Sequence, residues 1–249
     1  MRSFLVNVAA IFRREMASYF LSPIAYVAIC LFVLVNGWFF YNSTDKYRDH
    51  PQQIDAVIGA LYGGVPFWAL FLAPIFTMRL LAEEKRTGTL ETLMTVPVTS
   101  FQVVAGKFLA AEVFFILIWS TLLLHVLILG ILGNPDLGPV IAVSIGLVSL
   151  GALMNSLGLF ASALTRNQIV AVIVAFVGNL LLMSAGMGRR LFPGEPGVDR
   201  FFDFISIQAH FNDEYARGVL DLRFIGLDLA LAGVFFLLAV RTLEARRWR

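Results

Sequence analysis

The chain has 249 residues, of which 59% are hydrophobic and only 14% are charged. A soluble domain carries roughly a quarter charged residues, so this composition predicts a protein of the lipid bilayer. The formal net charge of +2 gives no reason to expect a nucleic-acid partner, and the single cysteine, Cys30, excludes an internal disulfide.

The N-terminal segment, residues 3–20, has the pattern of an amphipathic helix. Its apolar residues recur at spacings of three and four, and Ser3 can cap its start. Because charged residues interrupt the apolar ones, we expect this helix to lie in the membrane interface. An extension of the first membrane span is the alternative. Ser22-Pro23 then breaks the helix and turns the chain into the bilayer.

Six apolar segments follow, each with roughly the 17–25 residues that cross about 30 Å of hydrocarbon. They cover residues 24–41, 61–81, 108–132, 140–164, 169–187 and 224–240. We therefore predict an all-α polytopic membrane protein, with residues 1–249 forming a single transmembrane domain. Most Lys and Arg residues fall on the side that holds both termini, which predicts cytoplasmic termini.

The last polar region, residues 188–222, precedes the sixth span. Its apolar residues recur at three and four between Phe201 and Val219. This spacing predicts one or two short amphipathic helices at the outer surface, which dip into the bilayer or cap the bundle.

The polar stretch over residues 83–101 is the most informative part of the sequence. We expect the second span to continue into the cytoplasm, to bend at Gly88, and to lead into a short helix that Thr87 or Thr89 can cap. Thr99-x-x-Gln102 matches a capping box for the next helix. The apolar face of the short helix can sit in a groove on a partner, with charged residues at the rim. The residues of this face and rim are Leu90, Leu93 and Met94, and Glu83, Glu84, Arg86 and Glu91. An ordinary solvated or membrane-lying loop is the alternative.

Catalytic and nucleotide-binding motifs are missing from the sequence. Gly106-Lys107 comes closest to a phosphate-binding loop, but Phe101 and Phe108 stand where that motif needs Gly and Ser or Thr. No histidine has a metal-ligand spacing. We therefore expect no enzyme activity, no catalytic or metal site and no cofactor bound by this chain.

Four polar residues within the spans are candidates for function: Glu112, His125, Asn155 and Asn179. We expect Glu112 near the cytoplasmic headgroups, paired with a basic residue such as Lys107. The other three are expected to bridge helices. Two pairs of small residues, Gly59-x-x-x-Gly63 and Gly158-x-x-x-Ser162, can allow close helix packing.

Two stretches resemble ABC-2 type transporter permeases. The segment from Glu83 to Leu93 is similar to the acidic-basic-Gly-Thr-x-Glu signature of that family, and Pro97-Val98-Thr99 and Gly106-Lys107 are similar to the approach to its third span. The opening RREMASYFLSPIAYV resembles the bacterial gliding-motility-associated subgroup.

The resemblance implies a permease subunit of a bacterial inner-membrane ABC transporter. Such permeases pair with a second identical or related copy and with two separate ATPase subunits, which bind ATP and Mg. It also implies a coupling region that contacts the ATPase, formed by Glu83, Glu84, Arg86, Gly88, Thr89, Leu90, Glu91 and Leu93. Membrane lipids and an accessory protein on the outer side are further expected partners. Few charges lie within the spans, which favours a hydrophobic or amphiphilic cargo, or a mechanical role without a classical cargo, over a small ion.

Two other classes remain open at this point. A secondary transporter needs an intramembrane carboxylate for ion coupling, and Glu112 is the candidate. A non-transporting scaffold for envelope or motility machinery would bind partners without any change that depends on nucleotide. A neighbouring ATPase gene would separate both from the permease.

Overall fold

The computed structural model describes residues 2–46, 54–89, 98–132, 135–190 and 196–247, and within these ranges the chain is helical and has no strand. The helices are α1 (Arg2–Phe20), α2 (Pro23–Lys46), α3 (Ile54–Gly63), α4 (Val65–Thr77), α5 (Arg79–Thr87), α7 (Ser100–Trp119), α8 (Leu122–Leu132), α9 (Leu137–Leu164), α10 (Gln168–Ser184), α11 (Pro196–Ile205), α12 (Ile207–Ala209) and α13 (Leu222–Arg247). Short turns η2 (Ala185–Arg190), η3 (His210–Glu214) and η4 (Tyr215–Arg217) complete the chain. The prediction of an all-α polytopic membrane protein is confirmed.

Six helical segments are long and apolar enough to cross a membrane: Ala25–Asp45, Val57–Thr87, Ser100–Ile131, Leu137–Leu164, Gln168–Gly188 and Leu222–Ala245. Each overlaps one expected span. The second, third and sixth extend furthest beyond the expected bounds, because helix continues past the apolar residues at their ends. The second consists of α3, α4 and α5, and the third consists of α7 and α8.

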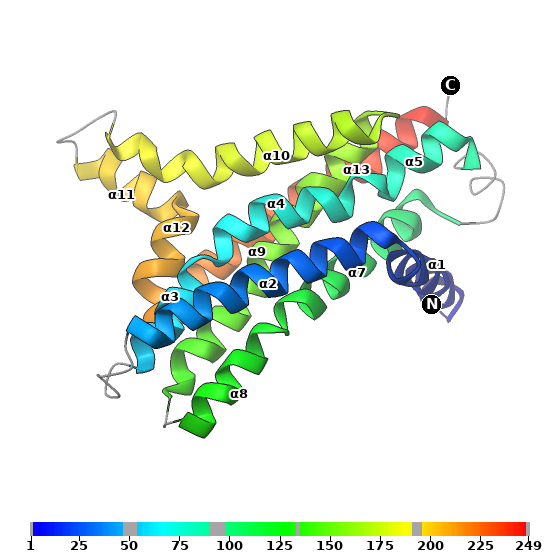
Figure 1. Cartoon of the computed structure of the whole chain (residues 1–249). Helices are drawn as coiled ribbons and strands as arrows, with labels where there is room; N and C mark the ends of the chain where they lie inside the picture. The colour runs from blue at the N-terminus through cyan, green and yellow to red at the C-terminus, as the bar shows by residue number, and fades with distance from the viewer. Residues whose placement is uncertain (1, 47–53, 90–97, 133–134, 191–195, 248–249) are drawn as a thin grey trace.

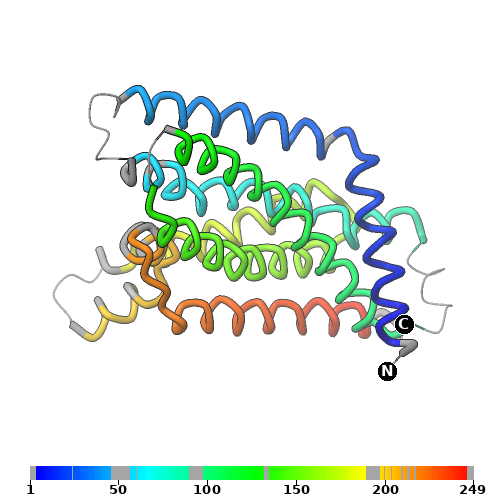
Figure 2. Tube along the Cα trace, turned by 90° about the horizontal axis from the view of Figure 1, so that it is seen from below, coloured from blue at the N-terminus to red at the C-terminus, as the bar shows by residue number. Residues whose placement is uncertain are grey.

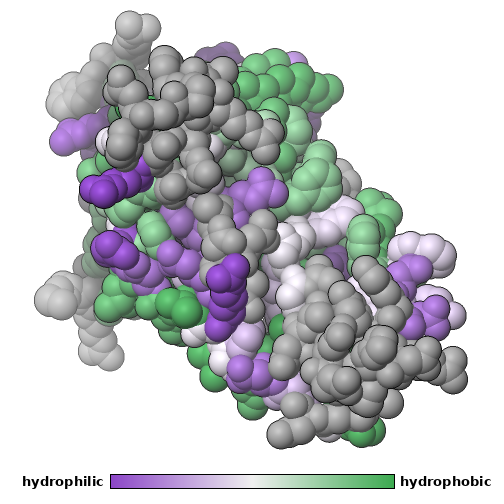
Figure 3. All heavy atoms as spheres, turned by 90° about the vertical axis from the view of Figure 1, so that its left-hand side faces the viewer, coloured by the Kyte–Doolittle hydropathy of each residue, from purple (hydrophilic) through white to green (hydrophobic). Residues whose placement is uncertain are grey.

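The two termini lie at the same end of the bundle, together with α5 (Figures 1 and 2). An even number of spans produces this arrangement. The opposite end carries α11 and α12, and Figure 3 shows hydrophilic residues gathered across that end among hydrophobic ones. These two ends are called the terminal end and the far end below.

Helix α1 runs across the terminal end at a steep angle to α2 (Figure 2). It ends just before Ser22-Pro23, as predicted, and Ser22 N donates to Tyr19 O at 3.1 Å in the turn. Its buried residues Val8 and Ile11 face α7.

Helix α9 lies at the centre of the bundle and is buried along most of its length, whereas α2 and α10 expose most of theirs. Small residues let neighbours approach it closely. A Cβ atom added at Gly158 would lie 2.1 Å from Thr77 Oγ1 of α4, and one added at Gly146 would lie 2.4 Å from Tyr215 Cε2. The expected close packing at Gly158-x-x-x-Ser162 is therefore confirmed, while Gly59 has open space around it.

The region before α13 contains the short helices that the spacing predicts. Phe211 and Tyr215 are buried, and Tyr215 packs against Gly146 of α9. Of the two expected arrangements, this contact favours a cap over the far end of the bundle.

Candidate functional site

The end of α5 carries the first half of the predicted coupling region. Gly88 ends the helix in the left-handed conformation, with φ of 74°, where the sequence predicted a bend. Glu83 is half-buried, and Arg86, Gly88 and Thr89 are exposed. The second half of this region, Leu90, Glu91 and Leu93 with Met94, lies outside the described residues, as does the short helix predicted there.

Glu84 does not occupy the rim position that we expected. It is only 7% exposed, and its Oε1 atom lies 2.9 Å from Lys107 Nζ of α7. The same oxygen accepts a hydrogen bond from Arg14 of α1. Glu84 therefore faces the protein interior and joins α5 to two other helices.

Four charged side chains form a neutral cluster here: Arg14, Glu15, Glu84 and Lys107. This cluster is the first of three sets of polar contacts, called joints below, that hold α5. Lys107 is fully buried, and its Nζ atom lies 2.8 Å from Glu15 Oε1. Arg14 Nη2 lies 3.3 Å from the same Glu15 oxygen. A buried ammonium is tolerated only when anions compensate it, and two carboxylates do so here.

Gly106 allows α1 to reach this cluster. A Cβ atom at position 106 would lie 2.8 Å from Ile11 Cβ and 3.0 Å from the carbonyl oxygen of Val8. Any larger residue would push α1 away from α7. The Gly106-Lys107 pair thus combines a close helix contact with a charge that binds the carboxylates of both α1 and α5.

A second joint holds α5 against α9. Ser162 Oγ accepts hydrogen bonds from the backbone N–H groups of Leu81 and Ala82, at 3.1 and 3.0 Å, and donates to Met78 O at 2.9 Å. The first N–H groups of a helix have no partner within it, so this serine supplies what the start of α5 lacks. Lys85, also buried, donates to Ala163 O.

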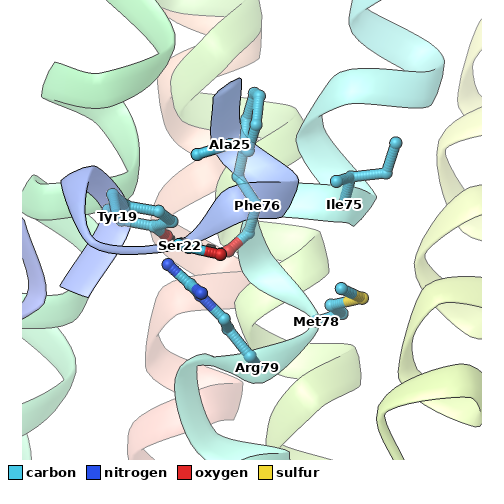
Figure 4. Close-up of a pocket in the computed structure, with 7 residues that line it drawn as sticks. All are labelled: Tyr19, Ser22, Ala25, Ile75, Phe76, Met78 and Arg79. Carbon is cyan, nitrogen blue, oxygen red and sulfur yellow. Dashed lines mark hydrogen bonds between the residues drawn. The ribbon is translucent and has the colours of Figure 1, made fainter. Parts of the chain in front are cut away.

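A third joint links the α1–α2 turn to the α4–α5 junction (Figure 4). Tyr19 donates from its hydroxyl to Phe76 O at 2.8 Å, and burial raises the pKa of its phenol, so the group stays protonated. Arg79 donates to Ser18 O at 3.0 Å, and its guanidinium carbon lies 4.8 Å from the centre of the Tyr19 ring. The pocket between them, about 10 Å³, is on the order of the space that one water needs.

Together these joints connect α5 to α1, α7 and α9. Most of these contacts are buried hydrogen bonds and ion pairs, whereas those of Arg14 and Arg79 are partly or fully exposed. A shift of α5 would therefore move its neighbours or break hydrogen bonds in a low-dielectric interior. A force applied at the exposed end of α5 would therefore reach the centre of the bundle.

Glu112 is not the partner of Lys107 that we expected. Its Oε2 atom accepts from Asn155 Nδ2 at 2.9 Å, which links α7 to α9, while Lys107 lies with Glu15 and Glu84. The difference arises because the two residues are about 1.4 turns of α7 apart, which places their side chains at different depths and on different faces of the helix. Asn155 bridges two helices, as predicted.

The other two intramembrane candidates have different surroundings. The His125 ring of α8 packs at 4.7 Å from the Phe40 ring of α2. Asn179 of α10 is fully buried, and its side chain has no hydrogen-bond partner among the described residues. Among the residues that the structure describes, no three His, Cys, Asp or Glu side chains form a group that could hold a metal ion.

Sequence reasoning missed Asp228. This buried carboxylate of α13 accepts a hydrogen bond from Ser149 Oγ of α9 at 3.1 Å. An acid about two turns inside an apolar helix was the available signal. It adds a polar link from α9 to α13, besides the links from α9 to α5 and α7.

The fold and the site define a class of protein: a multi-pass α-helical membrane protein whose polar joints converge on one helix end. The particular family follows from comparison. The model for the ABC-2 family transporter protein matches residues 9–216, so the chain belongs to the ABC-2 transporter family. No curated protein gave a match. Members of this family are membrane transport subunits, usually not catalytic themselves, and the family in general implies an ABC ATPase partner.

Proposed function

We propose that this chain is the permease subunit that couples ATP hydrolysis by a separate ATPase to movement of a hydrophobic or amphiphilic substrate. The observation that carries this proposal is that α5 runs from an exposed end directly into buried contacts with three other helices. Its end exposes Arg86, and the two residues just before it, Glu84 and Lys85, are fixed to α1, α7 and α9. Such a helix suits the transfer of a displacement from a partner into the bundle.

The predicted coupling residues divide into two roles in this proposal. Glu83, Arg86, Gly88 and Thr89, continuing through Leu90, Glu91 and Leu93, contact the ATPase. Glu84 acts from inside, because its carboxylate is already engaged by Lys107 and Arg14. It positions α5 and does not meet the partner.

The assembly proposed is two permease copies on two ATPase subunits, in a bacterial inner membrane with both termini cytoplasmic. ATP and Mg bind to the ATPase. The gliding-motility-associated subgroup and an accessory protein on the outer side are proposed from the resemblance of the N-terminal segment. The observation that both termini and α5 share one end of the bundle supports this orientation.

The test is to express the chain with an ATPase encoded beside it and to measure co-purification and ATPase activity. The double variant Glu83→Lys with Arg86→Glu reverses two side-chain charges at unchanged net charge. We expect it to lose ATPase binding while membrane insertion is kept. Arg200→Glu, an exposed change in α11 at the far end, is the control and should bind normally. Unchanged binding by the double variant would overturn the proposed contact.

A further inference from the structure

Arg79 is a half-buried arginine that has no carboxylate partner among the residues that the structure describes. It lies within a membrane-crossing segment, Val57–Thr87, whereas every other arginine with a described side chain is exposed. Three of those exposed arginines, Arg14, Arg223 and Arg241, do pair with a carboxylate. A charge within a membrane span normally pairs with another group and marks a functional site. The missing anion at Arg79 therefore calls for an explanation.

The guanidinium of Arg79 is held in place with most of its donors unused. It donates to Ser18 O at 3.0 Å, and its central carbon lies 4.8 Å from the centre of the Tyr19 ring. An arginine side chain has five N–H donors, and the Ser18 carbonyl takes one of them. A carbonyl oxygen also leaves the positive charge uncompensated, so this group is ready to bind an anion.

Ser22 supplies a second donor next to Arg79. Both residues line the pocket between the α1–α2 turn and the α4–α5 junction, and Figure 4 shows the Arg79 side chain extending towards that turn. Ser22 is 8% exposed, and its hydroxyl has no hydrogen-bond partner in the described part of the chain. By contrast, the Tyr19 hydroxyl is already bonded to Phe76 O. Neither the Ser22 hydroxyl nor the guanidinium is sealed inside the protein, so a ligand at the pocket mouth can reach both.

The pocket lies at the depth of the lipid headgroups. Helix α1 runs across the terminal end, and the first membrane-crossing segment begins at Ala25, three residues after Ser22. Next to the pocket, Phe20 and Leu21 are 43% and 83% exposed. Such apolar side chains at the edge of a span are covered by lipid. A ligand held here can therefore keep its polar group on the protein and its apolar part in the bilayer.

The size of the pocket limits what enters it. A volume of about 10 Å³ admits one water or one oxygen atom of a larger group, whose remainder stays at the mouth. A water would bridge the two donors but would not compensate the charge of Arg79. A phosphate oxygen does both, because arginine forms strong charge-assisted hydrogen bonds with phosphate.

We propose that Arg79 and Ser22 bind the phosphate group of an acidic phospholipid in the leaflet at the terminal end. One phosphate oxygen would accept hydrogen bonds from the guanidinium and from the Ser22 hydroxyl, while the acyl chains lie against Phe20 and Leu21. A lipid with net negative charge is favoured over phosphatidylcholine, because the choline group of the latter already balances its phosphate. The bound lipid would hold the α1–α2 turn against the α4–α5 junction.

Native mass spectrometry tests the site on the purified chain in mild detergent, without an ATPase. Phosphatidylglycerol and phosphatidylcholine with the same acyl chains are titrated separately, and the affinity for the first bound lipid is measured. We expect phosphatidylglycerol to bind about tenfold more tightly. Inorganic phosphate in large molar excess should not displace it, because free phosphate lacks the apolar contacts.

Three variants make the test specific. Arg79→Gln removes the charge, so the advantage of phosphatidylglycerol should disappear. Ser22→Ala should weaken phosphatidylglycerol binding severalfold, and it leaves the contact between Arg79 and Ser18 in place, so it tests the site even if Arg79→Gln fails to fold. Arg13→Gln removes the same charge from an exposed position of α1 at the same end of the bundle, and should keep the advantage.

Equal binding of the two lipids by the parent chain would overturn the proposed acidic lipid. An equal advantage in Arg79→Gln and Arg13→Gln, or unchanged affinity in Ser22→Ala, would overturn the site. Displacement by inorganic phosphate would identify a free anion as the ligand and overturn the lipid. Because binding is measured on the chain alone, failure here leaves ATPase coupling untouched, and failed coupling leaves this binding measurement unchanged.

Discussion

Lys107 Nζ lies 2.8 Å from Glu15 Oε1, although 92 residues separate them in the sequence. The same ammonium lies 2.9 Å from Glu84 Oε1. The buried charge of Lys107 on α7 thereby binds two helices at one point: α1, which runs across the terminal end, and α5, whose last residues are exposed. Breaking a buried pair is costly because an uncompensated charge stays behind.

Replacing Lys107 by Met should lower the free energy of unfolding by about 3–5 kcal/mol, because the carboxyl groups of Glu15 and Glu84 would lose their buried partner. Denaturant unfolding in mild detergent measures the loss. Arg14→Met is the matched comparison, since the Arg14 side chain is 56% exposed, and it should cost less than about 1 kcal/mol. Equal losses in the two variants would mean that the buried cluster does not hold α1 and α5.

Gly106→Ala should destabilise the protein by about 1–3 kcal/mol, because the added methyl overpacks the contact with Ile11. Gly59→Ala adds the same methyl where no heavy atom lies within 4 Å, and should be neutral or slightly stabilising. Thermal unfolding of the two variants side by side is the measurement. A loss at position 59 as large as at position 106 would contradict the contact between α1 and α7.

Local patterns in the sequence predicted the elements well, because caps and breaks depend on neighbouring residues. The Thr99 capping box is confirmed: Gln102 N donates to Thr99 Oγ1 at 3.2 Å, and Thr99 N donates to Gln102 Oε1 at 2.9 Å. The break at Ser22-Pro23 and the bend at Gly88 also depend on local backbone preferences.

The direction of long side chains was not predictable in the same way. Glu83, Glu84 and Arg86 look equally polar in sequence, yet Glu84 turns inward because α1 and α7 bring Arg14 and Lys107 to it. Helix docking, which a single sequence does not specify, decides which charge is buried. The pocket between Ser22 and Arg79 likewise depends on two turns that are distant in sequence.

Ser162→Ala should destabilise the first turn of α5. The backbone N–H groups of Leu81 and Ala82 would lose their acceptor, at a cost of about 1–3 kcal/mol. Hydrogen–deuterium exchange should then be faster in the peptide that contains Leu81 and Ala82. Ser184→Ala serves as the control, since Ser184 Oγ only donates to Leu181 O of its own helix. Unchanged exchange at Leu81 and Ala82 would show that another group satisfies them.

Gly88 provides the sharpest test of coupling, because its φ of 74° suits Gly and, less well, Asn. Gly88→Val should misdirect the chain that leaves α5 and reduce ATPase stimulation in the assembled complex severalfold, whereas Gly88→Asn should keep most of it. Space is not the cause, since no heavy atom lies within 4 Å of a Cβ atom added there. Both variants should insert like the parent, because the side chain at position 88 is exposed, and the left-handed backbone should cost the Val variant about 1–2 kcal/mol of stability. Equal ATPase stimulation by the Val and Asn variants would show that the left-handed turn after Thr87 does not transmit the motion of the ATPase.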